Sequence, residues 1–181
     1  RVPGSAAGFI ANRNPPEHTV TTRLAREHTM HTRGAIFTGF VDYAQMFMNI
    51  IKTCQRETER YTGVHPGVTE IVDLLHAEVQ GCYETGHGLT PWFGINKGTG
   101  QGCVNGATRA KLSLVLTQRT IRKLCEGYGH AISEGECITS LTYADDILLQ
   151  SSSIHEMAKM IECCWIVSQL SGTKVTVKGK A

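Results

Sequence analysis

Asp145 and Asp146 stand side by side in the stretch LTYADDILL (residues 141–149), between residues that favour burial in β-strands. Burying a carboxylate without a partner costs several kcal/mol, so buried acids are normally paired or bound to a cation. A tight turn between two strands is the second interpretation, because Asp readily bonds to its own backbone in turns. Such a turn favours Gly or Asn beside the acid, and Ala144 is neither. The residues of this stretch alone leave both interpretations open.

The surrounding hydrophobic pattern predicts an α+β fold in which a small antiparallel sheet is covered by helices on one face. Strands are expected over residues 35–41, 91–95, 137–143, 147–150 and 174–177. Helices are expected over residues 17–30, 43–60, 68–82 and 106–126, and a last helix precedes Gly172. A capping box, Ser153 to Glu156, opens this last helix, and Gly172 ends it in the position favoured for a left-handed cap. Its predicted apolar stripe consists of Ile154, Met157, Ala158, Ile161 and Trp165.

The composition is that of an ordinary globular domain. The 181 residues are 41% hydrophobic and 19% charged, with no stretch long and apolar enough to span a membrane and no visible signal peptide. The seven cysteines include no Cys-x-x-Cys pair, which favours a reducing intracellular compartment (nucleus, cytoplasm or an organelle) and argues against a zinc site. The chain opens on Arg1, so we expect a fragment or a processed product.

Basic residues are unevenly distributed, although the net charge is only +2. Residues 97–123 contain no acid and six basic residues, namely Lys97, Arg109, Lys111, Arg119, Arg122 and Lys123. Local basic stretches suit a phosphate-rich partner. Solvated faces are the simpler interpretation of the same residues.

A third acid, Asp42, follows the predicted strand over residues 35–41. If this strand and the 137–150 hairpin are neighbours in one sheet, Asp42, Asp145 and Asp146 meet at one edge. Three clustered carboxylates repel each other unless they share cations, and hard ions such as Mg²⁺ take oxygen ligands of this kind. Two such ions can stabilise the attacking and leaving oxygens of a phosphoryl displacement. The glycines of residues 97–103 let backbone approach a ligand closely, although such a loop alone is a weak indication.

Five stretches follow one another along the chain: AGFIANR (residues 7–13) with Glu17–His18, FVDYAQMF (40–47), GTGQGC (98–103), YADD (143–146) and GTKVTVK (172–178). In this order and at this spacing they resemble the reverse transcriptase of non-LTR (LINE-type) retrotransposons. The first is similar to the AGFRxxRS…DH stretch that precedes the palm, and the others to motifs A (FxDxxxAF), B (GxxQGC), C and D (GLKxNxxK). The resemblance runs almost the full length and implies a reverse-transcriptase palm with RNA-directed DNA polymerase (nucleotidyltransferase) activity.

The resemblance also implies roles for individual residues. Asp42 and Asp145 would bridge two Mg²⁺ ions, for which Mn²⁺ can substitute, with Asp146 as the more peripheral ligand. The carbonyl of Tyr43 would add an oxygen, and Phe47 would lie under the sugar and exclude a 2′-hydroxyl. The remaining implied nucleotide, template or phosphate contacts are Arg13, Gln101, Gly102 and Lys178. The implied partners are an RNA template, a DNA primer and deoxynucleotides, with no membrane.

The resemblance divides the chain into residues 1–34, a remnant of the fingers, and residues 35–181, a palm with motifs A to D and no thumb. A thumb grips the duplex, so this fragment alone is expected to polymerise poorly or not at all. The motifs also depart from the family pattern, at Met46 and Met48 in motif A, Gly106–Ala107 after motif B, and Gly179 between the lysines of motif D.

These departures support an alternative, in which a truncated or domesticated reverse-transcriptase-like domain has a structural or nucleic-acid-binding role in a larger assembly with other protein subunits. An RNA-dependent RNA polymerase shares the palm, but Phe47 argues against it because such enzymes need room for the 2′-hydroxyl.

Overall fold

The computed structural model describes residues 15–100, 103, 105–133 and 136–176. The described helices are α1 (Pro15–Thr32), α2 (Met46–Asn49), α3 (Lys52–Thr62), α4 (Pro66–Leu75), α5 (Gly106–Leu124) and α6 (Ile154–Ser171). The described strands are β1 (Phe37–Ala44), β2 (Gln80–Gly81), β3 (Glu84–Thr85), β4 (Gly88–Leu89), β5 (Phe93–Gly94), β6 (His130–Ser133), β7 (Glu136–Ile138), β8 (Ser140–Tyr143), β9 (Asp146–Ser151) and β10 (Lys174–Thr176). The chain therefore has the predicted mixture of helices and small antiparallel sheets.

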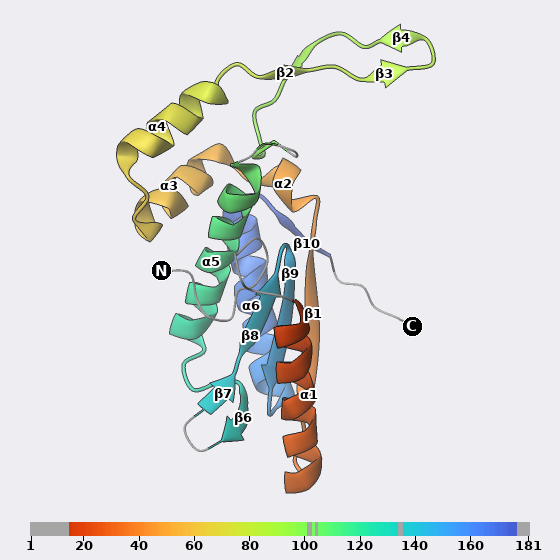
Figure 1. Cartoon of the computed structure of the whole chain (residues 1–181), viewed down its shortest axis with the longest axis vertical. Coiled ribbons are helices and arrows are strands. Elements are labelled where there is room, and N and C mark those ends of the chain that lie inside the picture. The colour runs from red at the N-terminus through yellow and green to blue at the C-terminus, as the bar shows by residue number, and fades with distance from the viewer. Residues whose placement is uncertain (1–14, 101–102, 104, 134–135, 177–181) are drawn as a thin grey trace.

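The central sheet has four strands in the order β10-β1-β9-β8, and every neighbouring pair is antiparallel. One face of it packs against α5 and α6 (Figure 1). Alternate residues of β1 and β9 supply this core, which contains Val41, Tyr43, Ile147 and Leu149 together with Leu114 and Ile121 of α5 and Met160 and Cys164 of α6. Because neighbouring strand residues point to opposite faces, the residues between these core positions lie on the other face.

The prediction that helices cover only one face is wrong for α1. Ala25 of α1 is fully buried in a second cluster with Ile138 and Leu141, against which Leu148 also packs. Leu148 lies between the core residues Ile147 and Leu149 on β9, so this cluster occupies the opposite face of the sheet. Figure 1 shows α1 in front of β1, with α6 behind the sheet. None of the helices in the described part of the chain covers the part of this face that carries β10 and the upper end of β1 (Figure 1).

The helix predicted over residues 43–60 is confirmed only in part: α2 and α3 lie within this region, but β1 continues through Asp42 to Ala44 and the two helices are separate. Burial of Tyr43 in the core holds it in the strand, and Gln45 then adopts a left-handed conformation with φ 49°. Helix α2 ends at Asn49, since the backbone at Ile50 and Ile51 is extended. The carbonyl of Ile50 accepts the Gly98 N–H, and the Ile51 N–H donates to the Ser171 carbonyl. These long-range bonds replace the local bonds of a continuous helix.

The last helix has the predicted ends but not the predicted buried face. The Ser153 hydroxyl accepts the Glu156 N–H at 3.2 Å, and Gly172 has φ 74° as a left-handed cap. The buried apolar residues of α6 are Met157, Met160, Cys163, Cys164 and Val167. Of the predicted stripe, Ile154, Ala158, Ile161 and Trp165 are exposed. Both sets satisfy helical spacing, so periodicity could not choose between them.

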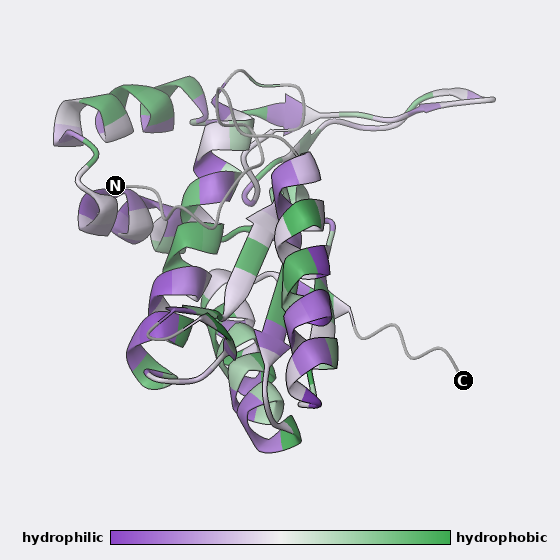
Figure 2. Cartoon of the chain, turned by 60° about the horizontal axis from the view of Figure 1, so that its bottom comes forward, coloured by the Kyte–Doolittle hydropathy of each residue, from purple (hydrophilic) through white to green (hydrophobic). Residues whose placement is uncertain are grey.

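The region predicted as a helix over residues 68–82 and a strand over 91–95 contains α4, which ends at Leu75, and a narrow two-stranded arm. The arm projects from the body beyond α2 and α4 (Figures 1 and 2). The rings of Tyr83 and Phe93 stack in it with centroids 5.2 Å apart. None of the described helices combines the length and hydrophobicity needed to cross a bilayer.

Candidate active site

Three of the acids singled out in the sequence line one pocket. Asp42 lies between the core residues Val41 and Tyr43, so its side chain belongs to the face opposite α5 and α6. Val41 pairs with Ile147, and the same register carried one step further places Asp42 opposite Asp146. A pocket of about 380 Å³ is lined by Phe40, Asp42, Asp145, Asp146 and Thr176. The structure therefore brings strands β1, β9 and β10 together at this point.

Asp145 lies in the two-residue turn of the β8–β9 hairpin, since Tyr143 pairs with Asp146 across it. Ala144 is not a residue that turns favour, yet it lies in this turn and adopts a left-handed conformation with φ 54°. This conformation is costly for a residue with a Cβ, and such strain persists where the surrounding structure enforces it, commonly at functional sites. The turn and the acid pair are thus the same feature, not alternatives.

The donor set fits a hard divalent cation in kind, because carboxylate oxygens are the ligands that Mg²⁺ and Mn²⁺ accept. Within the described part of the chain, however, no group of three or more His, Cys, Asp or Glu side chains is arranged to hold a metal ion. Carboxylates without a shared cation repel one another, so side chains that line one pocket are expected to point apart. Binding a cation here would require the three carboxylates to turn towards each other within the pocket.

Two further residues to which the resemblance assigns roles, Tyr43 and Phe47, belong to the core or pack against it. The Tyr43 side chain is only 3% exposed, its hydroxyl lies 3.4 Å from Thr117 Oγ1, and burial raises the pKa of Tyr43 well above its ordinary value. This side chain is therefore part of the core, and only the Tyr43 backbone is available for the implied ligand role. Phe47 is half-buried in α2 and packs against the core. Its implied role under the sugar stays a prediction.

The described part of the glycine-rich segment is fixed against α2. Phe47 O accepts the Thr99 N–H at 2.8 Å, and Ile50 O accepts the Gly98 N–H at 2.8 Å. Gly98 has φ 84°, and a Cβ there would lie 2.6 Å from Phe47 O. Gly106 replaces the serine that motif B usually has, and a Cβ at this position would lie 2.5 Å from Gly100 O. Gln101, Gly102, Arg13 and Lys178, which the resemblance places at the nucleotide or template, lie outside the described residues.

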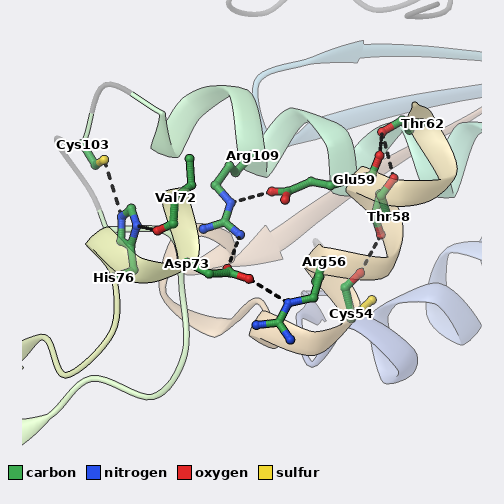
Figure 3. Close-up of polar contacts among 10 residues, drawn as sticks. All are labelled: Cys54, Arg56, Thr58, Glu59, Thr62, Val72, Asp73, His76, Cys103 and Arg109. Carbon is green, nitrogen blue, oxygen red and sulfur yellow. Dashed lines mark hydrogen bonds and ion pairs between the residues drawn. The ribbon is translucent and has the colours of Figure 1, made fainter. Parts of the chain in front are cut away.

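The basic run over residues 97–123 does not form one surface. Arg109 is 5% exposed, with its Nε 2.6 Å from Glu59 and its Nη2 3.3 Å from Asp73 (Figure 3). A nucleic-acid-binding role for Arg109 is therefore wrong, because the guanidinium is buried against two carboxylates. The Arg119 guanidinium lies over the Tyr61 ring, 5.0 Å from its centroid. Lys123 is exposed and stays available for such a role.

Sequence reasoning missed two features near this segment. The first is an ion network that runs from the buried Arg109 of α5 through Asp73 of α4 to the exposed Arg56 of α3. The second is a contact of 3.6 Å between Cys103 Sγ and His76 Nε2 (Figure 3). Both depend on residues 17 to 50 positions apart in the sequence. Periodicity within one element could not have paired them.

No protein-family model and no curated protein matches the sequence. The fold is nevertheless similar to solved structures of telomerase. Telomerase from Candida tropicalis, in complex with the TWJ fragment of telomeric RNA, matches with a TM-score of 0.68 at 9% identity over 95% of this chain and 29% of that one. Telomerase from Candida albicans, with the same type of RNA fragment, matches with a TM-score of 0.64 at 7% identity over 98% of this chain and 32% of that one. Apo telomerase from Candida tropicalis, truncated from its C-terminal domain, matches with a TM-score of 0.61 at 10% identity. The match covers 98% of this chain and 37% of that one.

The chain therefore has a reverse-transcriptase-like fold, the class to which telomerase is related. It spans about a third of the length of the telomerase chains that it matches. At identities of 7 to 10%, the similarity concerns the fold, and it is to telomerase and not specifically to LINE-type enzymes.

Proposed function

We propose that this chain is the palm of an RNA-directed DNA polymerase of the LINE type, which joins deoxynucleotides to a DNA primer on an RNA template. The observation that carries the proposal is the pocket that Asp42, Asp145 and Asp146 line together, from two paired strands and the turn between β8 and β9. The reverse-transcriptase-like fold supports it independently of the motifs.

In this proposal Asp42, Asp145 and Asp146 hold Mg²⁺, with Mn²⁺ as a substitute. The bound metal supplies positive charge that neutralises the transferred phosphoryl group. The chain's own contribution is positioning, because two of the acids lie on paired strands and the third on the tight turn that joins β8 to β9. The pocket of about 380 Å³ that these acids line is the space in which the primer terminus and the nucleotide meet in this proposal.

The residues around the pocket divide the remaining tasks. Phe47 forms a wall that excludes a 2′-hydroxyl, and Tyr43 contributes its backbone carbonyl. Gln101 and Gly102, which follow the segment bonded to α2 in the sequence, have the task of contacting the nucleotide and the template base. Arg13 and Lys178 contact phosphates.

Metal binding is testable on this chain without any activity. At a metal concentration about ten times Kd, the free energy of unfolding should rise by about 1.4 kcal/mol, which is about 3–6 °C in melting temperature for a domain of this size. Asp145→Asn should remove most of this rise, whereas Glu162→Gln, at an exposed acid of α6, should leave it unchanged. A melting temperature that responds to neither Mg²⁺ nor Mn²⁺ would count against the two-metal site.

Activity is tested with the chain placed in a longer polypeptide that supplies fingers and thumb. Primer extension on an RNA template should then occur with deoxynucleotides and Mg²⁺, and Asp42→Ala or Asp145→Ala should abolish it while the fold survives. Phe47→Ala should behave differently, with extension retained and ribonucleotides now accepted.

One observation favours a second function, a structural or nucleic-acid-binding module derived from such a palm. The described residues contain no ready-made group of three metal-binding side chains. If the longer polypeptide binds an RNA–DNA duplex but extends no primer with any divalent ion, this module replaces the polymerase as the function.

A further inference from the structure

Cys103 and His76 form a hydrogen-bonded thiol–imidazole pair away from the acidic pocket. Cys103 Sγ lies 3.6 Å from His76 Nε2, and His76 Nδ1 lies 2.7 Å from the backbone oxygen of Val72 (Figure 3). A carbonyl oxygen can only accept a hydrogen bond, so Nδ1 must carry the ring proton. Nε2 is then the unprotonated nitrogen, and it is the atom that faces the thiol.

Several contacts hold the backbone that carries the imidazole. The His76 N–H donates to Val72 O and Asp73 O, and the His76 carbonyl accepts from Lys52 Nζ at 3.0 Å. The Asp73 carboxylate, three residues earlier, is bound by Arg56 and Arg109. A thiol, a base in contact with it and an acceptor that fixes the base's tautomer are the arrangement that activates cysteine nucleophiles.

We propose that Cys103 is the reactive thiol of this chain and a modification site for peroxides. The Cys103 thiol gives its proton to His76 Nε2, and the sulfur attacks one oxygen of hydrogen peroxide. The S–O bond forms as the O–O bond breaks, and the departing hydroxide takes the proton from the imidazolium to become water. Sulfur is oxidised to a sulfenic acid and the peroxide is reduced, so thiol and peroxide give sulfenic acid and one water.

Four of the other six cysteines provide the contrast. Cys125, Cys163 and Cys164 are buried, and burial raises the pKa of Cys125 and of Cys164 to about 12. Cys137 is the exposed cysteine, and its thiol contacts the carbonyl of Tyr128 at 3.9 Å, which cannot take its proton. Exposure alone therefore predicts that Cys137 reacts first, whereas the imidazole contact predicts that half-buried Cys103 does.

The first experiment labels the native chain with a low dose of iodoacetamide and follows each cysteine peptide by mass spectrometry. Cys103 should react about tenfold faster than Cys137, a modest fraction of the roughly 10²–10⁴-fold effect of a positioned base in enzymes. In denaturant the two rates should become equal. If Cys137 is labelled as fast as Cys103 in the native chain, the proposal is overturned, independently of the results with variants.

The second experiment isolates the imidazole. His76→Gln should slow the labelling of Cys103 about tenfold, because the variant lacks the base that accepts the thiol proton. The labelling rate of Cys137 should not change. His87→Gln, at an exposed histidine of the arm, is the matched control and should change neither rate. An unchanged Cys103 rate in folded His76→Gln protein contradicts the assigned role of His76.

The third experiment tests the peroxide directly. Brief treatment with hydrogen peroxide should block later iodoacetamide labelling at Cys103 before it does so at Cys137, and dimedone should trap the sulfenic acid at Cys103. Oxidation that begins at Cys137, or a dimedone adduct absent from Cys103, would refute the modification site. None of these outcomes depends on polymerase activity.

Discussion

Replacing Arg109 by methionine should destabilise the fold more than the loss of any other cation from the ion pairs of the described residues. The Arg109 and Glu59 side chains are 6% and 4% exposed, and their atoms approach to 2.6 Å. Glu59 Oε2 has no hydrogen-bond partner among the described residues. The variant therefore leaves a buried carboxylate without its cation, while methionine preserves most of the apolar stem.

The magnitude follows from the cost of leaving one charge of a buried ion pair without its partner. Removing one partner of such a pair typically costs about 3–5 kcal/mol. This loss is equivalent to about 6–20 °C in melting temperature for a chain of this length.

Denaturant and thermal unfolding of three variants would check this reasoning. Arg60→Met removes a similar charge from an exposed pair with Glu57, in which the side chains are 71% and 65% exposed, and should cost less than about 0.5 kcal/mol. The double variant Glu59→Met/Arg109→Met should recover most of the loss, because an apolar pair of similar volume can replace a buried ion pair. If Arg109→Met costs no more than Arg60→Met, the buried pair does not exist as described.

Two further predictions concern backbone features. Gly98→Ala should destabilise more than Gly63→Ala, although both glycines have φ near 85° and share a strain of about 1–2 kcal/mol. A Cβ meets Phe47 O at 2.6 Å at the first position and nothing within 4 Å at the second, so equal melting temperatures would show that the glycine-rich segment does not contact α2 as placed. Ser153→Ala should lower the free energy of unfolding by about 1 kcal/mol, because it removes the hydroxyl that caps the Glu156 N–H. An unchanged free energy of unfolding in denaturant would contradict this cap.

Local signals predicted the elements whose causes are local. The capping box of α6, its glycine end and the β8–β9 hairpin are each specified within a few neighbouring residues, and the structure has all three. Long helices with apolar periodicity, such as α1 and α5, were also placed within a few residues of their observed ends. The family motifs led to the acids that line one pocket.

The failures have long-range causes. The helix expected after Asp42 is broken because Ile50 and Ile51 bond to Gly98 and Ser171, which are distant in sequence. The buried face of α6 depends on which of two apolar stripes meets the sheet. Arg109 looked like one member of a basic run, and only its contacts with α3 and α4 show that it is a buried ion-pair residue.

The same long-range packing determines where the acids lie. Val41 and Tyr43 are held in the core, so a shift of β1 by one residue would move Asp42 into that core and these apolar side chains out of it. The register is thus enforced by apolar neighbours, and Asp42 itself contributes little to it. For this reason Asp42→Ala should leave the fold intact, which makes a loss of metal response or of primer extension in that variant attributable to the missing carboxylate and not to unfolding.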